Sequence, residues 1–380
     1  MSRVPRGRLG CLSALPVVLL LAAVPYGAWW LQPVRSLRVL VVDKTVPAPT
    51  YREHKGLMWV MNHFRYVDPA VGGPFRYDRD YAGFVPQPAH RYAIRPVPPP
   101  SRPLDLVYLT DAYGVYSADF FGNDTSGERS RLVYGGLDAA EVEAAAAALR
   151  PGGTFIAEFN TFGDPTGPAG RQALEHLLGL SWTGWTGRFF RDLSPHVEVP
   201  EWLVRNYEAR HRRPWTFTGS GFALVNADER VVVLAQSRDV PPLALRLVFP
   251  DSVARRLGAA NRMPYLYWFD IVVPSAGTSV EAEYALDLLP SGRAALAAAG
   301  IPSRFPGILR REGPTSTAYY FAGDFADENS VPWPFRARWG ASLERLRSAV
   351  QIESGSAFYW RVYVPMMRRL LEEARPGHSP

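Results

Sequence analysis

The stretch GTFIAEFNTFGDPTG (residues 153–167) indicates the class of fold. It begins as an apolar run and continues as a loop rich in glycine and proline. An apolar run bounded by turn residues is typical of a buried strand. The run stops at Glu158 and Asn160, so a carboxylate and an amide stand at the predicted strand end. These two groups either belong to a working site or only terminate the strand.

Predicted strands and helices alternate around this stretch. Residues 37–47 and 104–116 each contain an apolar run that predicts a strand, and residues 51–66 show apolar side chains at helical spacing. The clearest helix begins at Asp138, a predicted N-cap with Glu141 three residues later. This alternation predicts an α/β fold with a doubly wound, mostly parallel sheet.

The pattern changes along the second half of the chain. Residues 36–196 are predicted to form the first part of the α/β domain, and residues 197–312 a β-rich insertion or subdomain. Residues 313–374 then supply the closing strand and helix, with Pro365 expected to kink or start the regular part of that helix.

The N-terminal segment has the composition of a membrane anchor. Residues 1–11 carry three arginines, and residues 12–31 carry no charge over about the length needed to cross a bilayer. The positive-inside rule then predicts a cytoplasmic N-terminus and an extracytoplasmic domain in a single-pass membrane protein. A cleavable signal peptide is the alternative, although Tyr26, Trp29 and Trp30 make a poor small-residue cleavage site.

Composition excludes several classes of chemistry. The one cysteine among 380 residues is Cys11, in the leader, so the predicted domain has no disulfide, cysteine metal ligand or cysteine nucleophile. The net charge is +6, but the arginines are scattered, and we expect no nucleic-acid partner. No phosphate-binding loop, dinucleotide fingerprint or HExxH motif is present, so we expect no cofactor and no metal. Carboxylate-bound Mg²⁺ or Ca²⁺ at the strand ends stays open.

Polar groups follow the predicted strands at the edge where α/β sheets bind ligands. The candidate catalytic residues are Asp43, Asp111, Glu158 and Asp324. The candidate ligand-binding residues are Lys44, Tyr113, Asn160, Thr161, Asp327, Trp182 and Trp185. The two tryptophans could form a stacking platform for sugar rings together with Phe189 and Phe190. Lys44 could neutralise an acidic ligand group or pair with Asp43. Two carboxyl groups at suitable separation could hydrolyse a glycosidic bond.

Three stretches carry a resemblance to a known family. They are DLVYLTD (105–111), LDAAEVEAAAAALRPGGTFIAEF (137–159) and AYYFAGDF (318–325), the last before a final amphipathic helix. In this order they resemble the class I glutamine amidotransferase-like superfamily. The likeness is greatest to its non-amidotransferase branches, the trimerisation domain of certain β-galactosidases and the trehalose-utilisation-type proteins. It covers residues 36–180 and 314–372 and implies a flavodoxin-like sheet.

The chain departs from this family at its catalytic position. Working amidotransferases place a cysteine nucleophile in a glycine-flanked turn after this strand, where the present sequence reads AEFNTFG (157–163). Because no cysteine follows Cys11, amidotransferase chemistry is excluded. Glu158 and Asn160 therefore stand where the resemblance places the catalyst.

Two functions follow as hypotheses. The first is a membrane-anchored extracytoplasmic domain without amidotransferase activity that binds an envelope saccharide or a partner protein. The alternative is a hydrolase of envelope polysaccharide that uses the four candidate catalytic carboxylates as acids and bases. The sequence predicts no oligomeric state.

Overall fold

The structure is a computed structural model that describes residues 23–70, 72–97, 102–122, 130–328, 331, 335–352 and 355–377. Residues 23–30 are helical, whereas residues 1–22, with most of the expected anchor, lie outside the described residues. Within the described ranges, no helix is both long enough and apolar enough to cross a membrane.

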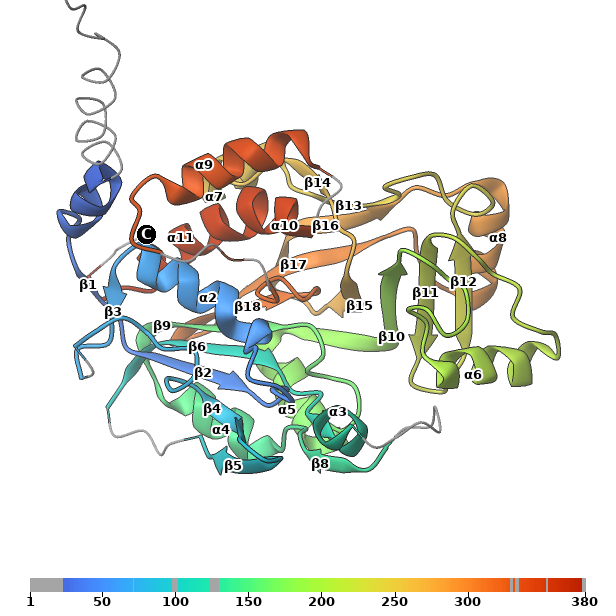
Figure 1. Cartoon of the computed structure of the whole chain (residues 1–380), viewed down its shortest axis with the longest axis horizontal. Coiled ribbons are helices and arrows are strands. Elements are labelled where there is room, and N and C mark those ends of the chain that lie inside the picture. Colours follow the sequence, from blue (N-terminus) through green and yellow to red (C-terminus); the bar gives the residue numbers. More distant parts are fainter. Residues whose placement is uncertain are drawn as a thin grey trace, which may run out of the picture.

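A ten-stranded mixed sheet forms the centre of an α/β fold (Figure 1). Its strands are, in spatial order, β14 (Arg262–Pro264), β13 (Leu245–Val248), β16 (Thr278–Leu286), β17 (Arg304–Glu312), β18 (Ser316–Phe321), β9 (Leu149–Glu158), β6 (Leu104–Asp111), β2 (Val39–Asp43), β4 (Ala82–Gln87) and β5 (Arg91–Arg95). The expected mostly parallel sheet is correct only for β18, β9, β6, β2 and β4. The flanking pairs are antiparallel; three residues join β4 to β5 and β17 to β18, and so short a connection permits only antiparallel pairing.

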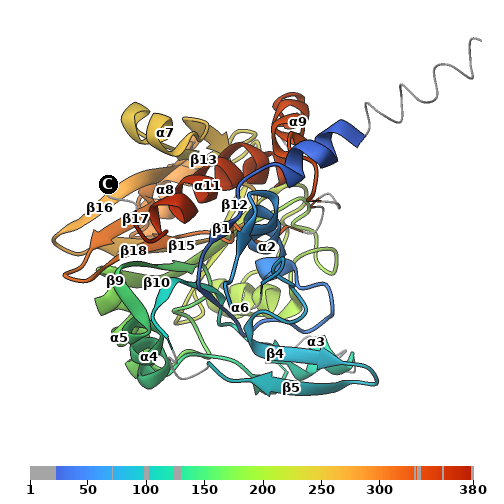
Figure 2. The same ribbon diagram turned by 90° about the vertical axis from the view of Figure 1, so that its left-hand side faces the viewer.

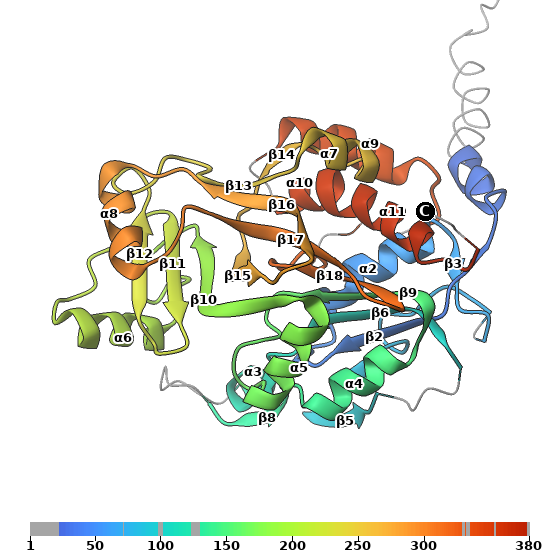
Figure 3. The same ribbon diagram turned by 180° about the vertical axis from the view of Figure 1, so that it is seen from behind.

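Helices cover both faces of the parallel strands. On one face lie α2 (Arg52–His63) and α11 (Val364–Glu373), which contact each other, and on the other lie α4 (Ala139–Ala147) and α5 (Pro168–Leu178) (Figures 1 and 3). The predicted capping box is present at the start of α4, where Asp138 accepts from the Glu141 backbone N–H. The five parallel strands lie side by side in the order β4, β2, β6, β9, β18. If they are renumbered 1 to 5 along the chain, this order is 2-1-3-4-5, so the strand order reverses at β2.

A second, antiparallel sheet stands beside the first. Its order is β12 (Val231–Ala235), β11 (Gly221–Asn226), β10 (Leu180–Phe190) and β15 (Trp268–Pro274). The helices α6 (Glu201–His211) and α8 (Pro290–Ala299) contact its β12 edge (Figure 1). Residues 197–312 therefore supply strands to both sheets, since β13, β14, β16 and β17 extend the main one.

The remaining elements are short. Two-stranded ladders join β1 (Arg35–Ser36) to β3 (Tyr66–Val67) and β7 (Val115–Tyr116) to β8 (Leu132–Tyr134), and the further helices are α3 (Ser117–Phe121), α7 (Asp251–Leu257), α9 (Gly340–Arg347), a 3₁₀ turn (Ser348–Val350) and α10 (Gly355–Phe358).

A π-helical turn, Tyr359–Tyr363, precedes α11 and is almost wholly buried. Pro365 lies in the first turn of α11, where its missing N–H is tolerated. Pro365 therefore starts the regular part of the final helix.

Candidate functional site

Asp43, at the end of β2, is sealed inside the protein. Its Oδ1 accepts from the Thr45 N–H at 2.9 Å, and its Oδ2 lies 2.5 Å from His54 Nδ1. His54 Nε2 donates to the Tyr77 carbonyl oxygen at 2.7 Å, so both ring nitrogens are engaged. Neither the Asp43 nor the His54 side chain has solvent-exposed area. This pair ties β2 to α2 and leaves no group for a ligand.

Asp111, at the end of β6, is equally enclosed. Its Oδ1 accepts from Thr45 Oγ1 and from the Tyr113 N–H, both at 2.7 Å, and its Oδ2 lies 3.4 Å from Asn160 Nδ2. Burial raises the pKa of Asp111 to about 8, so the group is largely protonated at neutral pH. Asn160 has φ +69°, a left-handed conformation that asparagine tolerates well. The Tyr113 ring itself is partly exposed.

Glu158, at the end of β9, holds the loop that follows β18. Its Oε2 accepts from the backbone N–H groups of Phe325 and Ala326 at 3.0 and 3.1 Å, and its Oε1 accepts from the Tyr108 hydroxyl. The Tyr108 hydroxyl lies 3.0 Å from that of Tyr363 on the π-helical turn. Burial raises the pKa of Glu158 to about 8. Glu158 is therefore a positioning residue for the loop, with its oxygens occupied.

The other predicted ligand-binding residues of this region are also committed to internal contacts. Lys44 Nζ donates to Glu141 and to the Gly136 carbonyl oxygen, each at 2.7 Å, so Lys44 pairs with Glu141 and not with Asp43. Thr161 Oγ1 donates to the Glu158 carbonyl oxygen at 3.0 Å.

The two tryptophans lie on β10, and the Trp182 ring would be 3.6 Å from a Cβ at Gly163, in the loop after β9. Trp185 is buried in the core, and the Arg230 guanidinium lies over its ring. Trp182 is on the same strand, and the Arg171 guanidinium lies over its ring. Neither ring lines the cleft that contains Asp324 and Asp327. Of the aromatic residues expected to form the stacking platform, Phe189 does line this cleft, whereas Trp182, Trp185 and Phe190 do not.

That cleft, of about 750 Å³, opens between the main sheet and the second sheet. Its volume is typical of a small-molecule site. Asp324 and Asp327 enter it from the loop after β18, Tyr265 and Tyr267 from the segment before β15, and Arg188 from β10. The rings of Phe189, Phe325, Phe358 and Tyr359 complete much of its apolar wall. Of the candidate catalytic carboxylates, Asp324 is the one that lines this cleft.

The charge of Asp327 disfavours the ionised forms of Asp324, in the cleft, and of Glu53, which does not line it. Tyr267 donates its hydroxyl to Asp327 Oδ2 at 2.7 Å, and Arg52 Nε lies 3.5 Å from the same oxygen and 2.9 Å from Glu53 Oε1. Burial first, and then neighbouring carboxylates, raises the pKa of Asp324, and burial raises that of Asp327. The pKa of Glu53 is raised for the same two reasons. Burial and neighbouring negative charge therefore disfavour the ionised form of these carboxyls.

Arg188 brings a cation to the same cleft. Its guanidinium lies over the rings of Phe190 and Trp268, at 4.7 and 5.1 Å from their centroids. Its Nε is buried and has no hydrogen-bond partner among the described residues. Burial lowers the pKa of Arg188, but an arginine stays charged at neutral pH. A donor without an acceptor beside a cleft is suited to a polar ligand group.

The floor of the cleft is fixed by a close packing contact. The Tyr359 hydroxyl donates to the Gly56 carbonyl oxygen of α2 at 2.9 Å. A Cβ at Gly56 would lie 2.5 Å from the Ala326 carbonyl oxygen and 2.8 Å from the Tyr359 ring. Helix α2, the loop with Asp324 and Asp327, and the π-helical turn therefore meet at a residue without a side chain.

Sequence reasoning missed Arg52, Glu53, Tyr267 and Arg188. A signal existed for the first two, because YREH (51–54) opens the helix after the first strand, and in a parallel α/β sheet that turn lies at the ligand-binding edge. No comparable signal marked Tyr267 and Arg188, which reach the cleft from the second sheet.

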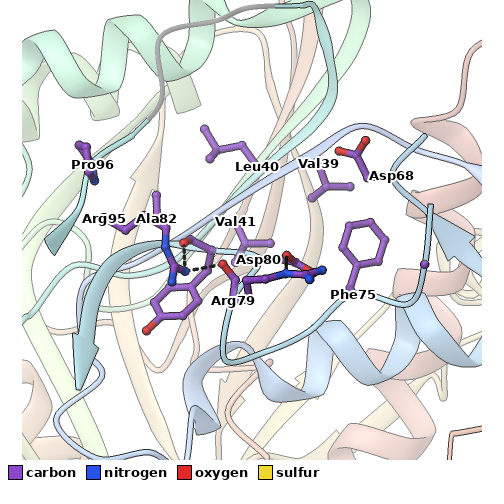
Figure 4. Close-up of a pocket in the computed structure, with 12 residues that line it drawn as sticks. Val39, Leu40, Val41, Asp68, Phe75, Arg79, Asp80, Ala82, Arg95 and Pro96 are labelled. Carbon is purple, nitrogen blue, oxygen red and sulfur yellow. Dashed lines mark hydrogen bonds and ion pairs between the residues drawn. The ribbon is translucent and has the colours of Figure 1, made fainter. Parts of the chain in front are cut away.

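A second hollow, of about 270 Å³, lies beside the first half of β2. Its wall includes Val39, Val41 and Phe75, and Arg79 pairs with Asp80 at its margin (Figure 4). None of the candidate catalytic carboxylates lines this hollow. In the part of the chain that the structure describes, no three His, Cys, Asp or Glu side chains are grouped to hold a metal ion.

Comparisons with known proteins identify no family. No model of a protein family matches the sequence, and no curated protein matches it. Similar solved structures include an exo-β-1,4-mannosidase from Opitutaceae bacterium strain TAV5 (TM-score 0.31, 10% identity, 86% of this chain and 36% of that chain). A second is a cytoplasmic protein from Salmonella typhimurium LT2 (TM-score 0.38, 11% identity, 89% of this chain and 99% of that chain). A third is the carbohydrate deacetylase Agd3 (TM-score 0.31, 10% identity, 76% of this chain and 30% of that chain). The chain thus spans about a third of the mannosidase and of the deacetylase.

Proposed function

We propose that this protein is an extracytoplasmic saccharide-binding domain, carried by an N-terminal membrane anchor, on an amidotransferase-like scaffold that lacks amidotransferase activity. The observation that carries the proposal is the cleft of about 750 Å³ in which Asp324, Asp327 and Arg188 face aromatic rings. Sites for small polar ligands combine apolar walls with a few polar groups that fix orientation.

The contacts suit the two surfaces of a sugar. Carboxyl oxygens of Asp324 and Asp327 can accept hydrogen bonds from sugar hydroxyls, and Arg188 Nε can donate to a ring, hydroxyl or carboxylate oxygen. The ring faces of Tyr265, Tyr267 and Phe358 provide apolar area for the C–H face of the sugar.

Three features support the amidotransferase-like, doubly wound part of the proposal. The parallel strands follow the order 2-1-3-4-5, one of the two common doubly wound orders. Helices cover both faces. Asn160 takes a left-handed conformation two residues after the end of β9, where the resemblance implies a sharp turn with a nucleophile. An amide cannot serve as that nucleophile.

A hydrolase that acts on envelope polysaccharide is the second candidate. The favouring observation is that two carboxyls with raised pKa values, Asp324 and Asp327, share an open cleft. Glycoside hydrolysis needs one carboxyl protonated and one ionised across the scissile bond. Asp43, Asp111 and Glu158 are withdrawn from the expected catalytic set, because internal hydrogen bonds occupy their oxygens.

One experiment separates these functions. We would incubate the full chain in detergent with a panel of envelope saccharides and measure both retention and new reducing ends. Retention without reducing ends, weakened about tenfold in Arg188→Gln and Asp327→Asn, supports binding. Release of reducing ends that Asp324→Asn abolishes supports the hydrolase.

Glu143→Gln is the matched control, because Glu143 is exposed on α4, on the other side of the sheet. Neither retention nor release across the panel would overturn the saccharide proposal. Capture of a protein at the same cleft, sensitive to Arg188→Gln, would support the partner-protein form of the first hypothesis instead.

A further inference from the structure

Exposed apolar side chains gather on α9 and the turn after it. Trp339, Leu343, Leu346 and Val350 are 50%, 65%, 72% and 85% exposed. Their spacing of four, three and four residues places them on one helix face. None of the residues of α9 is buried. We call these four side chains the α9 face. It is exposed to solvent.

The segment that leaves the N-terminal helix continues this face. Trp30, Leu31 and Val34 are 58%, 85% and 54% exposed. The two segments are in contact, because the Arg338 N–H donates to the Pro25 carbonyl oxygen at 3.1 Å and the Arg336 guanidinium lies 5.6 Å from the Trp30 ring centroid. Figure 2 shows α9 beside the blue N-terminal helix.

A basic groove lies between these segments and α7. Its volume is about 610 Å³, and seven arginines line it, with Glu372 as the one acidic residue among the described residues of its wall. Arg255, Arg338 and Arg345 form no ion pair with any described residue. Their charge is therefore available to an external anion, unlike that of Arg256, which pairs with Glu281.

We propose that the α9 face and this basic groove dock on the surface of a bilayer that contains anionic lipids. A helix with bulky apolar residues on one face and arginines at its margins is the pattern of an interfacial helix, with tryptophan at the depth of the headgroups. Guanidinium groups bind lipid phosphates in a bidentate manner. The inference rests on the membrane anchorage proposed above.

The position of the predicted anchor favours a bilayer as the surface that covers the α9 face. The uncharged residues 12–22 lead directly into the helix at 23–30, which contacts the start of α9. A span over the predicted residues 12–31, which include this helix, would keep the α9 face within reach of the bilayer at all times, so modest attraction suffices for docking. Docking would also fix the orientation of the domain, with its saccharide cleft at a set height.

The test uses the full chain in nanodiscs of phosphatidylcholine alone and of phosphatidylcholine with 30% phosphatidylglycerol. We expect hydrogen exchange of residues 339–350 to slow at least fivefold in the anionic nanodiscs compared with detergent, and less in the neutral ones. Protection should weaken in 0.5 M salt, because the attraction is screened. Leu343→Asp with Leu346→Asp, and separately Arg338→Glu with Arg345→Glu, should abolish it.

Val197→Asp is the matched control, since Val197 is 62% exposed in a loop outside this surface. Unchanged exchange in both nanodiscs would overturn the inference. Protection in detergent that grows with protein concentration would overturn it in favour of a second copy of the chain. A chain that does not enter nanodiscs at all contradicts the anchor, a failure that is distinguishable from α9 staying unprotected in a chain that does.

Discussion

The carboxylates of Asp43, Asp111 and Glu158 and those of Asp324 and Asp327 belong to the same edge of one sheet, yet they differ in what surrounds them. The first three accept hydrogen bonds from side chains or backbone groups that close over them. The other two line the cleft, where Tyr267 and Arg52 contact Asp327, whose side chain is 3% exposed. The end of a strand determines where a carboxylate lies. Whether its oxygens can bind a ligand depends on how many neighbouring donors already hydrogen-bond to them.

The two regions also depend on each other. Glu158 accepts from the peptide groups of Phe325 and Ala326, which lie between Asp324 and Asp327 in the chain. Glu158 therefore stabilises the conformation of the loop that contains Asp324 and Asp327. This dependence makes the comparison testable by substitution.

The largest effect is expected for Glu158→Ala. It would leave two buried N–H groups and the Tyr108 hydroxyl without their acceptor and create a cavity, which we expect to lower the free energy of unfolding by about 3–5 kcal/mol. Urea denaturation measures this loss. Glu158→Gln is the matched variant, because its carbonyl oxygen can still accept from both N–H groups, and about 1 kcal/mol should be lost. Equal losses would show that Glu158 does not hold the loop.

A pH dependence of stability should follow from the same region. Glu158 and Asp111 have a pKa of about 8 in the folded protein, above the values of unfolded carboxyls, so the folded state binds more protons. The contribution of these two groups to the free energy of unfolding is therefore fully present below pH 4. It is lost as the pH rises from there through 8. Between pH 6.5 and 8 we expect a loss of about 1–2 kcal/mol for each group.

Denaturation at three pH values in this window measures that slope, and Glu158→Gln should reduce it. Burial lowers the pKa of His63 to about 4, which has the opposite sign but acts below pH 6.5. Stability that rises between pH 6.5 and 8 would contradict the sealed, protonated state of these carboxyls.

Lys44→Met should affect stability without affecting the cleft. The variant loses the hydrogen bonds to Glu141 and Gly136, and we expect about 1–2 kcal/mol less stability because the Lys44 side chain is buried. Saccharide affinity, measured by calorimetry, should stay within twofold of the wild type. A tenfold loss of affinity would move Lys44 into the ligand site.

The smallest effect on stability is expected for Asp324→Asn at pH 8. This change removes a carboxyl whose ionised form is disfavoured first by burial and then by Asp327, so the melting temperature should stay the same or rise by an amount that corresponds to about 1 kcal/mol. Ligand retention should fall at the same time. A marked loss of stability would show that Asp324 is structural, like Glu158.

Sequence patterns predicted what depends on neighbours in the chain. The strand that ends at Glu158 and the cap at Asp138 follow from apolar runs and local hydrogen bonding. The closure over Glu158 depends on Phe325, 167 positions away, and sequence periodicity contains no such information. The mixed sheet was missed in the same way, because β16 and β17 join the main sheet through pairings that no local pattern specifies.

Gly56 gives the cleft a constraint that ligand contacts alone would not reveal. The loop with both cleft aspartates rests against this position, and the codon for glycine is one base from codons for larger residues. A natural substitution there would shift the loop without touching any ligand atom. Selection for ligand binding should therefore act on residue 56, and among natural variants of this protein the position is expected to remain glycine wherever Asp324 and Asp327 are kept together.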